Sequence, residues 1–177
     1  IGQGGMGTVY LAERADGQFE QQVAVKIVRQ TFVDGEIVRR FRNERQILAR
    51  LEHRNIARLL DGGLTGDGQP FLVMEYVDGR VITDFCRNLP LREILIAFLK
   101  VCRAVAYAHR NMIVHRDIKP SNILIDRENE PKLLDFGLTK LTADNADSAQ
   151  TKTAFHALTP AYASPEQLRG DGLSAAS

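Results

Sequence analysis

The sequence predicts an α+β fold with two lobes, a small β-rich lobe over residues 1–77 and a mainly helical lobe over residues 78–177. Three observations support this fold class. Apolar, β-branched runs recur in the first 77 residues, and a long amphipathic helical pattern covers residues 91–110. Between them, Val77-Asp78-Gly79 interrupts the apolar pattern, and we place the domain boundary there.

Bulk composition is that of an ordinary soluble globular protein, with 44% hydrophobic and 25% charged residues among 177. A net charge of +1 gives no electrostatic reason to expect nucleic acid or an anionic membrane as partner. The most apolar run, 94–99, is far shorter than the roughly 20 residues of a membrane span. Cys86 and Cys102 form no CxxC pair, and we expect Cys102 to be a reduced core thiol.

The first strands are expected at 8–12 and 23–28, as a hairpin around Asp16-Gly17. Because the preceding glycine run, 2–9, leads into a strand, it does not match a dinucleotide fingerprint, which leads into a helix. We interpret this run as a loop that covers phosphates. Glycine suits that role because side chains would keep backbone N–H groups away from phosphate oxygens.

Two further strands are expected at 56–60 and 71–76, joined by a turn that contains Gly62, Gly63, Gly66 and Gly68. Between the two strand pairs, residues 36–51 have helical periodicity. The apolar stripe of this helix consists of Ile37, Phe41, Leu48 and Leu51. Glu44 lies within that stripe and needs a cationic partner if it is buried. Lys26 is the favoured partner, and a partly exposed bond to Arg40 or Arg45 is the alternative.

Residues 91–110 form the strongest helix candidate, and we expect this helix to be a scaffold for the loop that follows it. Its predicted buried face consists of Ile94, Leu95, Phe98, Val101, Cys102 and Val105. Short strands at 123–125 and 132–134 then predict a hairpin that brings Asn122 and Asp135 close together.

Chemistry-bearing residues are concentrated around this hairpin. Asp117, Lys119 and Asn122 occur within six positions, and Asp135-Phe136-Gly137 follows. An acid, an amide and a second acid suit a reaction that orients a hydroxyl and holds a divalent metal against phosphates. An isolated His-Arg-Asp tripeptide would be read as a solvated loop, but the full spacing argues for catalysis.

Four ordered motifs together resemble the protein-kinase signature set. They are the glycine run 2–9, Lys26 in Val-Ala-Val-Lys, the segment 115–122 and the Asp-Phe-Gly triplet 135–137. Residues 159–166 are similar to the end of a kinase activation segment. The resemblance implies the truncated catalytic domain of a bacterial-type serine/threonine protein kinase, with a two-lobed kinase-like fold, ATP and Mg²⁺. Leu158 and Ser164 depart from the usual Gly and Ala, without touching a catalytic group.

In this resemblance, Asp117 accepts the substrate proton or orients the hydroxyl, and Lys119 reaches the transferring phosphate. Asn122 and Asp135 hold Mg²⁺, while Lys26, paired with Glu44, meets the α- and β-phosphates. The implied nucleotide-binding set is Ile1, Gly2, Gly4, Gly7, Val9, Ala24, Lys26, Met74, Glu75, Val77 and Leu124. Plain core packing explains its apolar members equally well.

Regulation is expected in the polar stretch 138–158, whose length inside a compact domain is unusual. A phosphate on Thr151 or Thr153 would bring up to two negative charges to Arg116 and order the segment. In the resembled family, Lys119 together with Thr159 marks enzymes that act on serine and threonine.

The resembled family continues beyond the position of Ser177, so a 177-residue fragment could lack stability or activity by itself. We expect a cytoplasmic domain, compatible with a membrane anchor elsewhere, and a protein substrate. Two alternatives stay open: a nucleotide-binding pseudokinase or interaction module, and a kinase-like small-molecule phosphotransferase.

Overall fold

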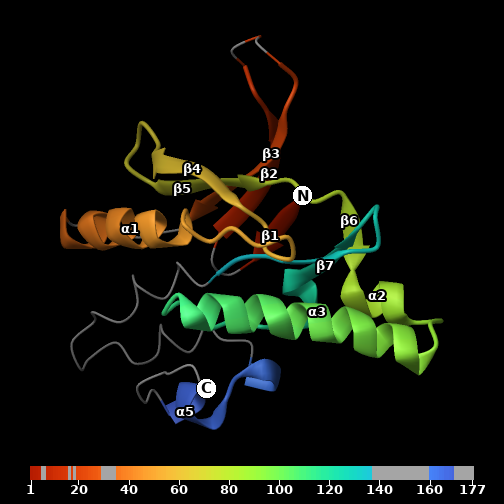
Figure 1. The fold of residues 1–177 in the computed structure, drawn as a ribbon. Coiled ribbons are helices and arrows are strands. Elements are labelled where there is room, and N and C mark those ends of the chain that lie inside the picture. Colours follow the sequence, from red (N-terminus) through yellow and green to blue (C-terminus); the bar gives the residue numbers. More distant parts are fainter. Residues whose placement is uncertain (5–6, 16, 18, 29–34, 137–159, 170–177) are drawn as a thin grey trace. The chain divides into compact units, whose positions relative to one another are not determined.

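A computed structural model describes residues 1–4, 7–15, 17, 19–28, 35–136 and 160–169 (Figure 1). The chain divides into two compact units. Apart from the gaps just given, the described part of the first unit comprises Ile1–Arg50 and Arg58–Tyr76. The second unit comprises Leu51–Ala57 and, among the described residues, 77–136 and 160–169.

An antiparallel five-stranded sheet forms the first unit, in the order β1-β2-β3-β5-β4 (Figure 1). Its strands are β1 (Gly2–Gly4), β2 (Gly7–Glu13), β3 (Gln22–Val28), β4 (Leu59–Leu64) and β5 (Pro70–Glu75). The predicted hairpin of β2 and β3 is present. Alternate residues of β3 are buried, namely Ala24, Lys26 and Val28, so one face of this strand packs inward.

The prediction for β4 was wrong in the bounds of the strand and in the placement of two glycines. The strand begins at Leu59 rather than Ile56, and Gly62 and Gly63 lie inside it rather than in the turn. A Cβ on Gly62 would lie 2.9 Å from the Phe71 carbonyl oxygen, so the strand needs glycine for its close approach to β5.

Helix α1 (Gly35–Leu48) confirms the predicted helix but ends three residues earlier than expected. Phe41 and Leu48 are buried as predicted. Leu51 is also buried, but it lies beyond the helix, in the segment that belongs to the second unit. The side chains of Ile37 and Glu44 lie outside the described part of the structure.

The second unit contains a three-stranded antiparallel sheet of β6 (Gly79–Val81), β7 (Ile123–Asp126) and β8 (Pro131–Leu133), beside α2 (Ile82–Cys86) and α3 (Leu91–Arg110). The predicted hairpin is β7–β8. Strand β6 was not predicted, because a glycine at position 79 indicates a loop rather than a strand. A Cβ at this position would lie 2.3 Å from the Ile125 carbonyl oxygen, so glycine permits the pairing with β7.

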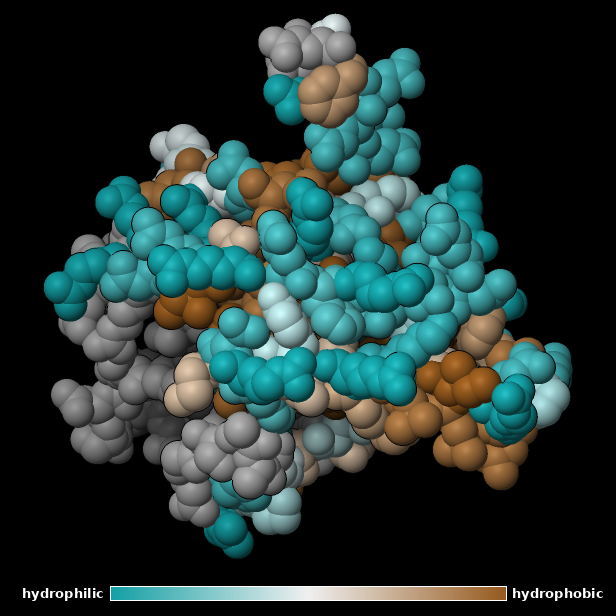
Figure 2. All heavy atoms as spheres, in the orientation of Figure 1, coloured by the Kyte–Doolittle hydropathy of each residue, from teal (hydrophilic) through white to brown (hydrophobic). Residues whose placement is uncertain are grey.

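Helix α3 has the predicted bounds, but its predicted buried face was largely wrong. Leu95 and Phe98 are 50% and 57% exposed, and Cys102 is an exposed free thiol rather than a core thiol. The buried side chains are Ala97, Val101, Ala104 and Ala108. Small residues let the helix approach β8 closely, while large apolar side chains gather over its N-terminal part at the surface (Figure 2).

Candidate active site

The central feature of the second unit is a carboxylate held by a cation and an amide. One oxygen of Asp117, Oδ2, accepts hydrogen bonds from Lys119 Nζ at 2.9 Å and from Asn122 Nδ2 at 3.0 Å. The same amide also donates to the Asp117 carbonyl oxygen at 2.8 Å. The carboxylate is 14% exposed, and no hydrogen bond to the described residues occupies Oδ1. Asp117 is therefore oriented through one oxygen, and its other oxygen can accept a hydrogen bond, or the proton, from a hydroxyl group.

His115 fixes the backbone next to this carboxylate. It is buried, its Nε2 lies 2.7 Å from the Leu134 carbonyl oxygen, and its Nδ1 accepts the Asp117 N–H at 3.3 Å. These roles require a neutral ring with its proton on Nε2. Burial lowers the pKa of His115, opposed by the Leu134 carbonyl and by the charges of Asp135 and Asp117, so the neutral form is favoured.

Asn122 and Asp135 lie at the same end of the β7–β8 hairpin. Asn122 ends the short 3₁₀ turn Pro120–Asn122, and its carbonyl oxygen accepts the N–H of Leu134, next to Asp135, at 2.8 Å. Asp135 has φ 60°, an uncommon conformation for a residue other than glycine. The ring of the next residue, Phe136, packs on the His115 ring with centroids 4.6 Å apart. The predicted proximity of the amide and the second acid is thus present in the backbone.

These two residues fit a magnesium ion. The side-chain nitrogen of Asn122 donates both of its hydrogen bonds to Asp117. Within the described residues, nothing bonds to the side-chain oxygen of Asn122. Mg²⁺ prefers one or two hard oxygen ligands from the protein, completed by phosphates and water. The described residues hold no cluster of three or more His, Cys, Asp or Glu that would cage a metal by itself.

The first unit brings several predicted nucleotide-binding residues onto one face of its sheet. Val9 pairs with Lys26, and Ala24 pairs with Met74, so these four share a face. Ala24 and Lys26 are buried, whereas Val9 and Met74 are half-buried. The backbone nitrogen of Ile1 donates to the Val9 carbonyl oxygen at 2.9 Å.

Gly7 and Gly2 of the predicted phosphate-covering loop differ in whether packing requires a glycine. Gly7 has φ 151°, and a Cβ there would lie 2.2 Å from the Ile27 carbonyl oxygen, so strand packing alone demands it. At Gly2 a Cβ would make only an ordinary contact, 3.8 Å from Val9 Cβ. Among the described residues nothing requires glycine at position 2, and its role in covering phosphates stays a prediction.

The remaining predicted residues are placed as follows. Glu75 ends β5, and its N–H donates to the Arg58 carbonyl oxygen at 2.9 Å. Val77 is buried at the start of the second unit, and Leu124 is half-buried in β7. Arg116 adopts a left-handed backbone with φ 68°. Gly4 pairs with Gly7 in the backbone, and Thr151, Thr153, Thr159 and the Glu44 side chain lie outside the described residues.

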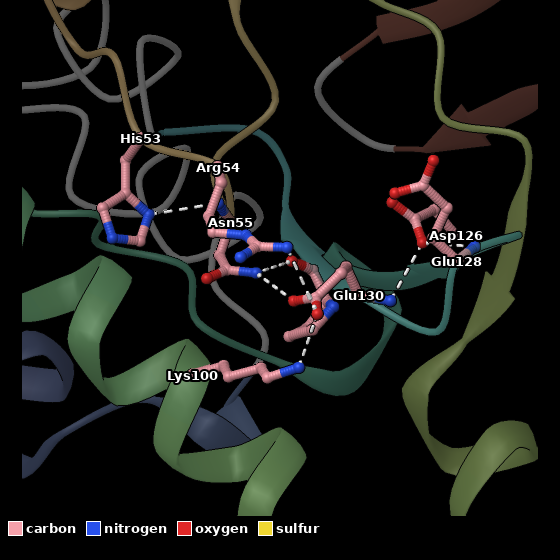
Figure 3. A network of polar contacts seen from close by, with 8 residues as sticks. His53, Arg54, Asn55, Lys100, Asp126, Glu128 and Glu130 are labelled. Atoms are coloured by element: carbon pink, nitrogen blue, oxygen red, sulfur yellow. Dashed lines mark hydrogen bonds and ion pairs between the residues drawn. The ribbon is translucent and has the colours of Figure 1, made fainter.

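Sequence reasoning missed a polar network that anchors residues 51–57 within the second unit (Figure 3). Asn55, 4% exposed, donates from Nδ2 to the Pro131 carbonyl oxygen at 2.8 Å and to Glu130 at 3.3 Å. Glu130 also bonds Lys100 of α3 at 2.6 Å and Arg54 at 3.3 Å. The Lys100 hydrogen bond lowers the pKa of Glu130, helped by Asn55 and opposed by burial.

A family model described as the protein kinase domain matches residues 1–177. The chain belongs to the protein kinase domain family. The kinase domain is 43% identical over 176 residues to serine/threonine-protein kinase PrkC of Bacillus subtilis, covering 96% of the chain and 26% of that protein. It is 37% identical over 184 residues to PknB of Mycobacterium leprae, covering 100% of the chain and 29% of that protein.

The fold agrees with that of a solved bacterial kinase. The kinase domain matches the crystal structure of the PknI kinase domain of Mycobacterium tuberculosis with a TM-score of 0.72 at 30% identity, covering 99% of this chain and 65% of that one. The predicted kinase-like fold and family are thus confirmed. The chain spans less than a third of the length of PrkC and PknB. Among the described helices of the kinase domain, none is long and apolar enough to cross a membrane.

Proposed function

We propose that this chain catalyses transfer of the terminal phosphate of ATP to serine and threonine hydroxyls of protein substrates. One observation carries the proposal. Lys119 and Asn122 hold Oδ2 of Asp117, while no described residue bonds to Oδ1. A carboxylate fixed in this way can orient an incoming hydroxyl and take its proton, which is worth about 10²–10⁴-fold in rate.

Lys119 has a second use in this reaction. Its ammonium group bonds Oδ2 of Asp117, whereas the substrate hydroxyl would bind at Oδ1. From there the ammonium can act as a point charge that stabilises the transferring phosphate. Because phosphoryl transfer depends mostly on positioning and charge stabilisation, a cation beside the base supports both requirements. In the first unit, buried Lys26 would bind the α- and β-phosphates with Glu44 as its partner.

Asn122 and Asp135 would hold Mg²⁺, through the side-chain oxygen of Asn122 and the carboxylate of Asp135. When bound, the metal neutralises charge on the phosphates of ATP. Ile1, Gly2, Gly4, Gly7 and Val9 would cover the nucleotide. Its adenine would contact Ala24, Met74 and Leu124, and the backbones of Glu75 and Val77. Since the Glu75 N–H bonds to Arg58, a contact from Glu75 would use its carbonyl oxygen.

The substrate class and the regulation follow from the same assignment. The curated relatives are named serine/threonine-protein kinases, which supports a hydroxyl of serine or threonine as acceptor. Lys119 and Thr159 would contribute to that choice. Phosphorylation of Thr151 or Thr153 would place negative charge near Arg116 and activate the enzyme. We propose that the domain works in the cytoplasm.

The test is radiolabel transfer from [γ-³²P]ATP to a generic protein substrate by the full-length protein. Wild type is compared with Asp117→Asn, which keeps the size of the side chain and removes its basicity. We expect transfer to fall at least 100-fold in the variant, at the low end of what general-base help supplies. Equal transfer by both proteins would refute the assignment of Asp117.

The same experiment separates the two alternatives. A nucleotide-binding interaction module would bind ATP in a thermal-shift assay without transferring label in either form. A small-molecule phosphotransferase would consume ATP in the presence of a metabolite mixture while leaving proteins unlabelled. Mass spectrometry of the labelled protein then locates the modified serine or threonine, and an active sample with Thr151 and Thr153 unmodified would exclude the proposed regulation.

A further inference from the structure

Helix α5 (Pro165–Arg169) begins with a reciprocal pair of hydrogen bonds. The Ser164 N–H donates to Gln167 Oε1 at 3.0 Å, and the Gln167 N–H lies 3.4 Å from Ser164 Oγ. This is a capping box, in which a residue before the helix and one in its first turn satisfy each other's backbone donors. The side-chain oxygen of Gln167 is used here, and its NH₂ group is left for another partner.

That partner is the catalytic loop, 51 residues earlier in the chain. Gln167 Nε2 donates to the Arg116 carbonyl oxygen at 2.8 Å. Arg116 has φ 68°, a conformation that side chains disfavour and that persists only where its surroundings fix it. The N–H of the same peptide unit, which belongs to Asp117, donates to His115 Nδ1 at 3.3 Å. The Arg116–Asp117 peptide is therefore held at both its oxygen and its nitrogen.

We propose that Gln167 is a positioning residue for Asp117. It touches no reacting group, and it acts by holding the Arg116–Asp117 peptide plane, from which the Asp117 side chain projects toward Lys119 and Asn122. The catalytic part of this inference depends on the proposed function. The competing explanation is that Gln167 only caps α5, in which case its oxygen matters and its NH₂ group does not.

One substitution separates the two explanations. Gln167→Glu keeps an oxygen for the Ser164 N–H, because glutamate serves equally well at this position of a capping box. It replaces the NH₂ group by a second oxygen, which faces the Arg116 carbonyl and cannot donate when ionised. Ser164→Ala is the matched control, since it removes the capping hydroxyl and keeps the Gln167 amide. Gln167→Met supplies a second variant that lacks both functions at similar length.

Two measurements on the full-length protein report the result. In steady-state kinetics we expect Gln167→Glu and Gln167→Met to lower kcat about tenfold, with KM for ATP within about twofold, because misplacing the base affects the transition state rather than nucleotide binding. Ser164→Ala should keep kcat within about twofold. In hydrogen–deuterium exchange, a peptide over residues 113–119 should exchange faster in both Gln167 variants and at the wild-type rate in Ser164→Ala.

Each outcome decides the inference separately from the proposed function. An active wild type whose kcat is unchanged by Gln167→Glu would overturn the positioning role and leave the kinase assignment standing. An inactive wild type would refute the kinase assignment, and exchange at 113–119 would still decide whether Gln167 holds the loop. Unchanged exchange in both Gln167 variants, or equal acceleration in Ser164→Ala, would overturn the inference whatever the activity.

Discussion

Replacing Asn55 by alanine should be among the most damaging single changes in the second unit. The Asn55 side chain is 4% exposed and binds the Pro131 carbonyl oxygen at 2.8 Å. The segment around it is also attached to β8 by backbone bonds, from Ala57 N–H to Leu133 O at 3.0 Å and from Leu133 N–H to Asn55 O at 2.9 Å. The change therefore removes the side-chain anchor of a segment whose backbone anchors remain.

The magnitude follows from the groups that lose their partners. Pro131 is fully buried, so its carbonyl oxygen would be left unsatisfied, which costs about 1–3 kcal/mol. Glu130 would lose one of its donors, at 3.3 Å, but would retain Lys100. A charged hydrogen bond of this kind is worth about 1.5 kcal/mol at the low end of its range. Together these losses predict a fall of about 3 kcal/mol in the free energy of unfolding.

Urea unfolding of the full-length protein, followed by circular dichroism and by exchange of peptides from residues 51–57, measures this change. Arg54→Gln is the control, because Arg54 bonds the same glutamate from a side chain that is 71% exposed. Exposed ion pairs contribute about 0–1 kcal/mol, so we expect little change there. If Asn55→Ala cost no more than Arg54→Gln, the buried network could not be what anchors the segment.

Three further predictions concern stability. Gly7→Ala should destabilise the protein by about 1–3 kcal/mol through overpacking against Ile27, while Gly2→Ala leaves thermal stability unchanged and raises KM for ATP. Met112 is 91% exposed at φ 61° after α3, so Met112→Gly should stabilise by about 1 kcal/mol in urea titrations. Because the folded-state pKa of His115 is lowered, its stabilising contribution is complete above about pH 6.5 and is lost as pH falls below it. Unfolding curves at pH 7.5, 6.5 and 5.5 should show a slope of up to about 1.4 kcal/mol per pH unit that His115→Phe removes.

Features with a local signal could be predicted from the sequence. The β2–β3 hairpin was predicted from β-branched runs around Asp16-Gly17, and α3 was predicted at Leu91–Arg110 from its apolar periodicity. The catalytic loop is equally local. Asp117, Lys119 and Asn122 lie within six residues, and the structure joins all three at one carboxylate.

The predictions that were wrong concern features that depend on which elements pack against one another. Helix α3 is apolar on several sides, so periodicity could not tell that the small side chains of Ala97, Ala104 and Ala108 would be buried and the large Phe98 would not. Gly62 shows the same difficulty in a strand. Its reason to be glycine is the Phe71 carbonyl, which no local pattern reveals.

Remote side-chain contacts to the backbone are the hardest features to predict from sequence. Gln167 and Asn55 each donate to a carbonyl oxygen, 51 and 76 residues away in the chain. Any residue type could supply such a carbonyl, so sequence gives no partner to search for. Arg116 needs the hydrogen bond from Gln167 nonetheless, because its left-handed backbone costs about 1–2 kcal/mol and does not hold itself. If Gln167 positions Asp117 as proposed, a kinase sequence can retain every motif residue and still lose activity through a change at a position that no motif contains.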